Sequence, residues 1–401
     1  MITIDEKHKC CGCSACASIC PNNCIIMKPD SEGFLYPHID KEQCIECGMC
    51  EKVCPVLNTP RKQGEPKSII IRNNNASVVE ESTSGGAFSS FATSIIEDEN
   101  GEVYGALFDK DNKLVHKAIN KTSDLYLLRG SKYVQSDTNN SFREVKEKLK
   151  AGKSILFSGT PCQIAGLKNY LNGEYEEKLY CIDIVCRGTP SPKVWSEYVS
   201  HMEKKYNSKI TRALFRNKTY GYHASTMLIE FENGKVYKKS GRVDPMMRLF
   251  TRELCSRPSC SECAFKDKSR ISDLTLFDCK KYTMVTGKKD DDKGYTSVLI
   301  HSEKGKELLE RVSESIHVED ADIDLLIEKC GVMVCNKAQP NPKRPELFRM
   351  LGKKPIDEIV QIVAPFSRKD RIIEASKGLL NKVGLISLAR RFKKHEDIVV
   401  K

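Results

Sequence analysis

The stretches "CCGCSACASICP" (residues 10–21) and "CIECGMCEKVCP" (residues 44–55) determine the fold of the first part of this chain. Both contain the spacing C-x2-C-x2-C-x3-C-P, and the first copy adds one cysteine, Cys11. Two short gaps let one loop wrap a cubane, while the fourth cysteine reaches across to a second cubane. The repeated spacing therefore predicts two iron-sulfur clusters whose ligands are exchanged between the copies.

This run is the bacterial ferredoxin pattern, and it predicts a small dicluster module with two 4Fe-4S clusters. The expected ligands are Cys10, Cys13, Cys16 and Cys54 for one cluster, and Cys20, Cys44, Cys47 and Cys50 for the other. A zinc site prefers two C-x2-4-C pairs separated by a longer loop, and it has no use for a fourth cysteine followed by proline. Cys11 and Cys24 fit no ligand position and are interpreted as small buried or loop thiols.

Composition sets the cellular context that we expect. The 401 residues include 19 cysteines, and the formal net charge is +11. No apolar segment for export is recognisable, which predicts a cytoplasmic protein whose thiols are metal ligands in a reducing compartment. No apolar run of about 18 residues predicts a membrane helix. Lys and Arg are spread along the chain, and the thiolate-bound clusters carry negative charge, so no nucleic-acid partner is expected.

Beyond the module, strand and helix patterns alternate, which predicts a mixed α/β domain. The stretch "VLNTPRKQGEPK" (residues 56–67) is rich in Pro, Gly and charge and is typical of a linker. We therefore expect a ferredoxin-type domain at 1–57, a linker at 58–67 and a new domain from residue 68. Because this linker offers few apolar groups, the two units are expected to pack weakly and to be separable.

Two glycine-bearing turns and a group of cysteines carry the chemistry of the larger domain. The turns "STSGG" (82–86) and "SGTPCQ" (158–163) present backbone N–H groups where a helix begins, an arrangement that attracts phosphate or carboxylate. Cys162 lies in the second turn, Cys186 follows a predicted strand, and Cys260 and Cys263 form a C-x2-C pair. Four thiols suffice for a third cluster, although spacing alone admits three substitutes among the ligands, which are Cys181, Cys255 and Cys279.

From Cys10 to about Phe348 the chain resembles the coenzyme F420 hydrogenase/dehydrogenase beta subunit family. The resemblance lies in the motifs "STSGGAF", "RGSKYVQS", "GTPCQIAGL", "DIVCRGTPSP", "LCSRPSCSECAF", "RISDLTLFD", "DDKGYTSVLI" and "QPNPKRPELF", which occur in this order. It implies an N-terminal part of the family domain at 68–157, a C-terminal part at 158–348 and a basic helical tail at 349–401.

The resemblance also implies cofactors and site residues. A flavin, normally FAD, would bind in the α/β domain beside a third 4Fe-4S cluster, whose ligands would be Cys162, Cys186, Cys260 and Cys263. The expected flavin or substrate contacts are Ser84, Gly85, Gly86, Thr160 and Gln163. The deazaflavin coenzyme F420 is a further cofactor that the resemblance admits.

Together these features predict an iron-sulfur flavoprotein oxidoreductase. Electrons would pass between the ferredoxin-type clusters, the flavin and a two-electron substrate or a redox partner protein. Two alternatives stay open, namely an electron-transfer subunit without a substrate of its own and a redox-sensing iron-sulfur protein. In the tail, "DRIIEASKGLLNKVGLISLARRFKK" (370–394) has basic residues between apolar ones at helical spacing, which admits either peripheral membrane contact or a closing helix packed on the domain.

Cluster number gives the first testable prediction. Anaerobically prepared protein should contain about eight iron atoms in the N-terminal module, and about twelve in total with the third site. Replacing Cys47 with Ser should remove about four of them, because a cubane that lacks one thiolate is lost as a unit. Iron and acid-labile sulfide analysis measures this. An unchanged iron content would contradict the ligand role of Cys47.

Overall fold

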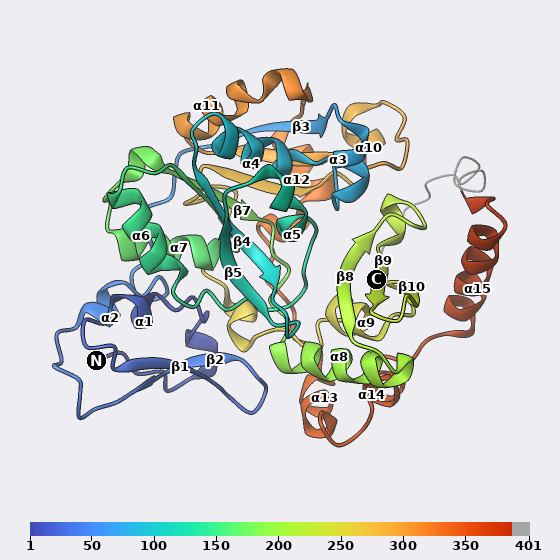
Figure 1. The fold of residues 1–401 in the computed structure, drawn as a ribbon, viewed down its shortest axis with the longest axis horizontal. Coiled ribbons are helices and arrows are strands. Elements are labelled where there is room, and N and C mark those ends of the chain that lie inside the picture. Colours follow the sequence, from blue (N-terminus) through green and yellow to red (C-terminus); the bar gives the residue numbers. More distant parts are fainter. Residues whose placement is uncertain (387–401) are drawn as a thin grey trace.

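The computed structural model describes residues 1–386 and contains three sheets (Figure 1). The N-terminal module carries a two-stranded hairpin and lies next to helices α6 (Ser141–Lys150) and α7 (Pro161–Leu171), which cover a central eight-stranded sheet. A three-stranded sheet stands on the other side of the molecule and is flanked by helices α8 (Pro192–Tyr206) and α9 (Pro245–Thr251). This arrangement confirms the predicted mixed α/β fold with a ferredoxin-like module at its N-terminus.

The module consists of short elements joined by cysteine-rich loops. Its hairpin pairs Ile25 with Ile39 in antiparallel register, and the Asp30 carboxylate holds the turn by accepting the N–H groups of Glu32 and Phe34, both at 3.0 Å. The elements are η1 (Lys7–Lys9), α1 (Ala15–Ile19), β1 (Ile25–Pro29), β2 (Leu35–Ile39) and α2 (Met49–Lys52).

The central sheet has the strand order β13-β3-β12-β11-β7-β6-β4-β5. Strands β4, β6, β7 and β11 run parallel to one another, while β5, β12, β3 and β13 join by antiparallel pairs. The strands are β3 (Lys67–Asn73), β4 (Glu102–Phe108), β5 (Leu114–Ile119), β6 (Ile155–Gly159), β7 (Leu179–Ile184), β11 (Leu274–Asp278), β12 (Thr296–Ile300) and β13 (Ile316–Asp320). The expected division at residues 157 and 158 falls inside β6, so both parts of the family domain build one sheet.

Successive side chains of each strand point to opposite faces of the sheet, and apolar side chains occupy both faces. Helices therefore cover both faces of this sheet. In β6, Ile155 and Phe157 pack on one face and Leu156 packs on the other. The Leu156 face carries α4 (Ala87–Glu97), α5 (Leu125–Leu128) and α11 (Glu303–Arg311). The opposite face carries α6 (Ser141–Lys150), α7 (Pro161–Leu171), α10 (Tyr282–Thr286) and α12 (Ile323–Cys330), while α3 (Ala76–Glu81) follows β3.

The three-stranded sheet has a core of its own. Trp195, 2% exposed, lies in this core among aromatic and aliphatic side chains of the sheet and its helices. The sheet contains β8 (Ile210–Asn217), β9 (Thr226–Phe231) and β10 (Val236–Ser240), and the helices are α8 (Pro192–Tyr206), α9 (Pro245–Thr251), α13 (Arg344–Met350) and α14 (Ile356–Val363). The expected tail, from residue 349, thus begins inside α13 and supplies core residues through α14.

Short 3-10 helices connect the larger elements. They are η2 (Thr122–Asp124), η3 (Glu176–Lys178), η4 (Tyr222–Ala224), η5 (Pro258–Glu262), η6 (Ser313–Ser315) and η7 (Val332–Val334).

Helix α15 (Arg368–Lys382) ends the described part of the chain and turns a carboxylate inward. Glu374, 5% exposed, accepts hydrogen bonds from the backbone N–H and the hydroxyl of Ser240 at 3.2 and 2.5 Å. Ile372 and Leu379, 65% and 64% exposed, face outward. Of the two alternatives for the tail, a membrane contact is not tested by these contacts, and residues 387–394 of the expected amphipathic stretch lie outside the described residues. Within residues 1–386 no helix is long and apolar enough to cross a membrane.

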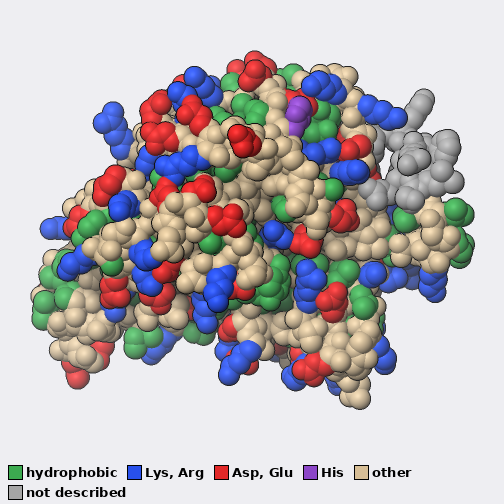
Figure 2. All heavy atoms as spheres, turned by 45° about the horizontal axis from the view of Figure 1, so that its top comes forward, with side chains coloured by type: hydrophobic (Ala, Val, Ile, Leu, Met, Phe, Trp, Pro, Cys, Tyr) green, Lys and Arg blue, Asp and Glu red, His purple; other side chains and the backbone are tan. Residues whose placement is uncertain are grey.

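The surface mixes charges of both signs. On the face that Figure 2 shows, Lys and Arg side chains are interspersed with Asp and Glu side chains.

The module is fastened to the rest of the chain by polar contacts, which contradicts the expectation of weak packing between the units. Arg257, 2% exposed, donates hydrogen bonds to the carbonyls of Cys10 and Leu35 at 2.7 and 2.9 Å, and to Gln135 Oε1 at 3.0 Å. Its guanidinium also lies over the Tyr36 ring, 4.1 Å from the centroid. The linker composition did not reveal these contacts, because residues far along the chain supply them.

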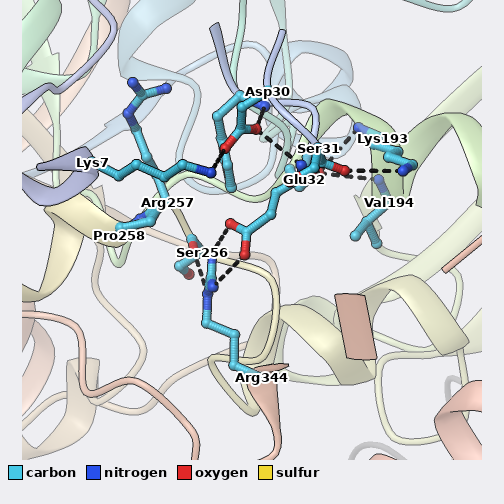
Figure 3. Close-up of polar contacts among 12 residues, drawn as sticks. Lys7, Asp30, Ser31, Glu32, Lys193, Val194, Ser256, Arg257, Pro258 and Arg344 are labelled. Carbon is cyan, nitrogen blue, oxygen red and sulfur yellow. Dashed lines mark hydrogen bonds and ion pairs between the residues drawn. The ribbon is translucent and has the colours of Figure 1, made fainter. Parts of the chain in front are cut away.

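The hairpin turn is held in the same way (Figure 3). Arg344 binds the Glu32 carboxylate through both of its terminal nitrogens, Lys193 Nζ donates to the Ser31 carbonyl at 3.0 Å, and the Ser191 hydroxyl donates to the Glu32 carbonyl. The turn of a small hairpin is therefore locked between helix α8 and helix α13.

Removing the Arg257 anchor should loosen the module. Arg257→Ala deletes three hydrogen bonds and leaves two half-buried carbonyls and the buried Gln135 side chain without this donor, so we expect a loss of roughly 3–5 kcal/mol in the free energy of unfolding. Urea titration of the anaerobic protein, followed by circular dichroism and limited proteolysis near residues 58–67, measures the change. Arg371→Ala on the exposed side of α15 is the matched control and should leave the midpoint unchanged. Equal midpoints for both variants would show that Arg257 is not an anchor.

Candidate functional site

Two cavities in the module are each lined by four of the expected cluster ligands. The outer cavity is lined by Cys20, Cys44, Cys47 and Cys50, together with Cys24. The inner cavity is lined by Cys10, Cys13, Cys16 and Cys54, together with Cys11. The structure therefore brings together both sets of cysteines that the sequence spacing groups.

The chemistry of these thiols fits a multi-iron group. Burial raises the pKa of Cys16 to about 12 and also raises the pKa of Cys10, so the thiolate form requires a strong cation beside it. Within residues 1–386 no three metal-ligating side chains come close enough to share one ion. In a cubane each thiolate binds a different iron, and thiols spaced around a cavity suit that geometry.

The inner cavity faces the large domain. Gly166 of α7 allows this approach, because a Cβ at this position would lie 2.8 Å from the Cys13 sulfur. Thr138 also donates a hydrogen bond to the Cys13 carbonyl at 3.1 Å. The outer cavity is lined by residues of the module alone, and Cys47 on its wall is exposed.

A third set of thiols, Cys162, Cys186, Cys260 and Cys263, meets at one edge of the central sheet. Cys162 follows β6 and lies in the first turn of α7, and Cys186 follows the neighbouring parallel strand β7. Cys260 lies within η5, and Cys263 directly follows it. These thiols are near enough to perturb one another electrostatically, and burial raises the pKa of Cys186 to about 12.

The three substitutes that spacing left open lie in other places. Cys181 is buried under α7 in the core of the large domain, and Cys255 is buried in the core of the three-stranded sheet. The Cys279 sulfur lies 3.8 Å from that of Cys330. The geometry thus groups the third set as the family resemblance implies.

Cys11 connects the inner cavity to the third set. A hydrogen bond with Cys13, together with burial, raises the pKa of its thiol well above the ordinary value, while a hydrogen bond with Cys162 acts in the opposite direction. The sequence pattern indicated only a small buried or loop thiol at Cys11, and its place between two groups of sulfur atoms was not predicted. The one feature of the sequence that could have indicated this position is the dense run of cysteines around Cys11.

One basic side chain, that of Lys266, lies beside the third set. Lys266 Nζ donates to the carbonyls of Cys186 and Met333, the latter at 2.7 Å, and burial lowers the pKa of Lys266. Such a cation lies where it offsets the negative charge of a thiolate-bound cluster.

Thr160 and Gln163 lie at this same edge, where they cap α7. The Thr160 N–H and hydroxyl both donate to Gln163 Oε1 at 3.0 Å, and Gln163 Nε2 donates to the Ser136 hydroxyl at 3.0 Å. Their polar atoms are thus engaged within the protein, and their contact with a flavin stays a prediction.

Ser84, Gly85 and Gly86 lie elsewhere along the edge. Gly86 directly precedes α4 and adopts a φ of 86°, which favours glycine. The Gly85 N–H donates to Thr296 Oγ1 at 2.9 Å, and the Ser84 hydroxyl donates to the Tyr295 carbonyl. Strands β12, β11 and β7 separate this turn from β6, roughly 19 Å at the usual strand spacing. The two predicted turns therefore do not meet.

Between these turns lies a charged group that sequence analysis missed. Arg216 at the end of β8 donates to Asp278 Oδ2 at 2.6 Å and to the Tyr133 hydroxyl at 3.2 Å. Lys218 donates to the Ser84 carbonyl at 2.9 Å, and burial lowers the pKa of Lys218 to about 8. The sequence feature that could have indicated this group is an arginine next to the apolar residues of a strand, in "ALFRN" (213–217).

A dicluster module packed against an α/β domain with its own thiol set defines the class of iron-sulfur electron-transfer proteins. Residues 9–58 match the family described as a 4Fe-4S dicluster domain, and residues 152–324 match the family described as the C terminus of the coenzyme F420 hydrogenase/dehydrogenase beta subunit. Residues 152–324 therefore carry the C-terminal domain of this beta subunit family, and the dicluster domain lies N-terminal to it, which confirms the family expected from the motifs of the chain.

Among solved structures, the chain is similar to a chain of the F420-reducing NiFe hydrogenase complex from Methanosarcina barkeri, which was studied by xenon derivatization. The two chains share 16% identity with a TM-score of 0.44, and the match covers 75% of this chain and 91% of the other. No curated protein sequence matches the chain.

The third thiol set predicts a separable loss of iron. Cys260→Ala should lower the iron content by about four atoms and leave the spectra of the two module clusters intact. Cys255→Ala is the matched control, because its thiol lies apart in an apolar core, and it should keep full iron content. If Cys162→Ala and Cys260→Ala both retain all iron, these thiols are structural only.

Proposed function

We propose that the chain is an iron-sulfur flavoprotein oxidoreductase that passes electrons between two module clusters, a third cluster, a flavin and a two-electron substrate or partner. The observation that carries this proposal is the succession of three thiol sets, with Cys11 between the inner cavity and the third set. Buried cysteines that only fill space have no reason to gather in this way.

The cofactors would divide the chemistry between them. Iron-sulfur clusters exchange single electrons, and a bound flavin couples such transfers to a two-electron reaction. The residues proposed to hold the module clusters are the four expected ligands around each cavity. Cys162, Cys186, Cys260 and Cys263 are proposed for the third cluster.

The flavin, proposed as FAD, is assigned to the edge of the sheet that carries the third thiol set. In open α/β sheets, ligands bind outside the carboxyl ends of parallel strands, and Thr160, Cys186 and Asp278 all lie at or just beyond those ends. Orphaned buried polar atoms, among them the Tyr222 hydroxyl and two Arg216 nitrogens, fit a ligand with polar groups here. For the two-electron partner of the flavin, we propose the deazaflavin coenzyme F420, as the resemblance to the family suggests.

The protein's own residues would set distance and charge. Arg257 fixes the inner cavity against the large domain, since it bonds the carbonyl of a cysteine on the cavity wall. Lys266 would balance negative charge at the third set, and the apolar core beneath α7 buries Cys13.

A second candidate function is an electron-transfer subunit without a substrate of its own. Exposed apolar side chains around the outer cavity favour it, because surfaces of this kind contact other proteins. They are Ile45 and Met49, which line this cavity and are 63% and 37% exposed. A redox partner protein would then bind beside Cys47.

Flavin content decides between these functions and a purely sensing role. Anaerobically purified protein should release flavin in about equal amount to the chain, and a reduced viologen dye should reduce that flavin through the clusters. In Cys260→Ala the dye-driven reduction should slow, while a two-electron reductant should still reduce the flavin. Protein that holds iron and sulfide but neither retains nor binds flavin would contradict the oxidoreductase proposal.

A further inference from the structure

The guanidinium of Arg216 is buried but only partly paired. The residue is 9% exposed, and its Nη1 atom takes both partners, Asp278 and Tyr133. Its Nε and Nη2 atoms are buried and have no hydrogen-bond partner. These two nitrogens form one edge of the planar group, and their N–H bonds point the same way, which is the fork that binds a carboxylate or phosphate through two hydrogen bonds.

Leaving such donors unpaired is costly. A buried polar group without a partner costs about 1–3 kcal/mol, and a charged one costs more. Native proteins rarely keep such a group unless a ligand, an ion or a water completes it. The Tyr222 hydroxyl, in a residue that is 2% exposed, is likewise without a partner, and the Arg216 guanidinium carbon lies 5.9 Å from the centroid of the Tyr222 ring.

The surrounding charge favours an anion. The positive charge of Arg216 is the main cause that lowers the pKa of Lys280 to about 8, and Lys218 is only 3% exposed. The carboxylates that face this group are Asp278, which Arg216 already pairs, and Glu80, which interacts with Lys218. Three cationic side chains against these two carboxylates leave an excess of positive charge at the end of β11.

We propose that the free edge of the Arg216 guanidinium binds an oxyanion, a carboxylate or phosphate group of a small molecule that occupies this end of the central sheet. The location lies beside the Ser84 turn, since Lys218, two residues beyond Arg216, donates to the Ser84 carbonyl. The oxyanion belongs either to the two-electron substrate or to the cofactor, and only that assignment rests on the proposed function. The anion site itself is independent of it.

Titration calorimetry with inorganic phosphate, in low-salt chloride buffer and on protein freed of flavin, tests the site. Arg216→Lys keeps the charge but removes the fork, so we expect phosphate to bind at least about tenfold more weakly. Arg72→Gln is the matched control, because all of its bonds are internal, to the Gly294 carbonyl and to Asp291. It should bind phosphate as the unchanged protein does.

A second variant, expected to bind phosphate more tightly, keeps the test valid if Arg216→Lys misfolds. Asp278→Asn removes the anion that competes for the guanidinium, so phosphate binding should tighten several-fold. Unchanged affinity in both site variants, equal weakening in Arg72→Gln, or no measurable phosphate binding would overturn the proposal.

Comparison of flavins identifies the source of the oxyanion. If the group is the cofactor's phosphate, FMN should bind more tightly than riboflavin, and Arg216→Lys should abolish the difference. If it belongs to the substrate, phosphate should still bind the flavin-loaded protein in an Arg216-dependent manner. A protein that binds phosphate through Arg216 but never binds flavin would refute the oxidoreductase proposal and leave the anion site intact.

Discussion

The contact on which the arrangement depends is the buried guanidinium of Arg257. This one side chain bonds the carbonyl of Cys10 on the inner cavity wall, the carbonyl of Leu35 in the hairpin and the side chain of Gln135 in the large domain. A rigid planar donor that meets three acceptors fixes orientation as well as distance. Because rates of electron transfer fall steeply with separation, a module held in this way keeps its inner cavity against the third thiol set.

The central sheet gathers the chemistry along one edge. Parallel strands β6, β7 and β11 lie side by side, so the residues at or just beyond their ends, Cys162, Cys186 and Asp278, are brought to the same edge although more than a hundred positions separate the first from the last. Arg216 reaches this edge from the three-stranded sheet. The site is therefore shared between two sheets and the module, and no segment of the chain contains it alone.

Local patterns in the sequence predicted local structure well. The spacing of the N-terminal cysteines identifies both cavities, because a loop of fixed length constrains its own geometry. Spacing could not choose among the cysteines of the large domain, since their approach depends on strand order, and the family resemblance supplied that choice. Arg257 and Arg216 were missed because a single arginine carries no pattern, and its burial depends on partners brought in by the fold. The weak packing expected from the linker was wrong for the same reason.

The antiparallel pairing of β3 has a consequence for how the protein is made. Ile71 pairs with Thr296, so this strand waits for more than two hundred later residues before the sheet can close. At 5–20 residues per second, synthesis takes on the order of ten seconds or more to reach its partner. Meanwhile the cysteines of both cavities have all left the ribosome, and neither Arg257 nor Arg344 yet holds the module down. Biosynthesis thus leaves an interval in which the module exists before the contacts that hold it against the central sheet are complete.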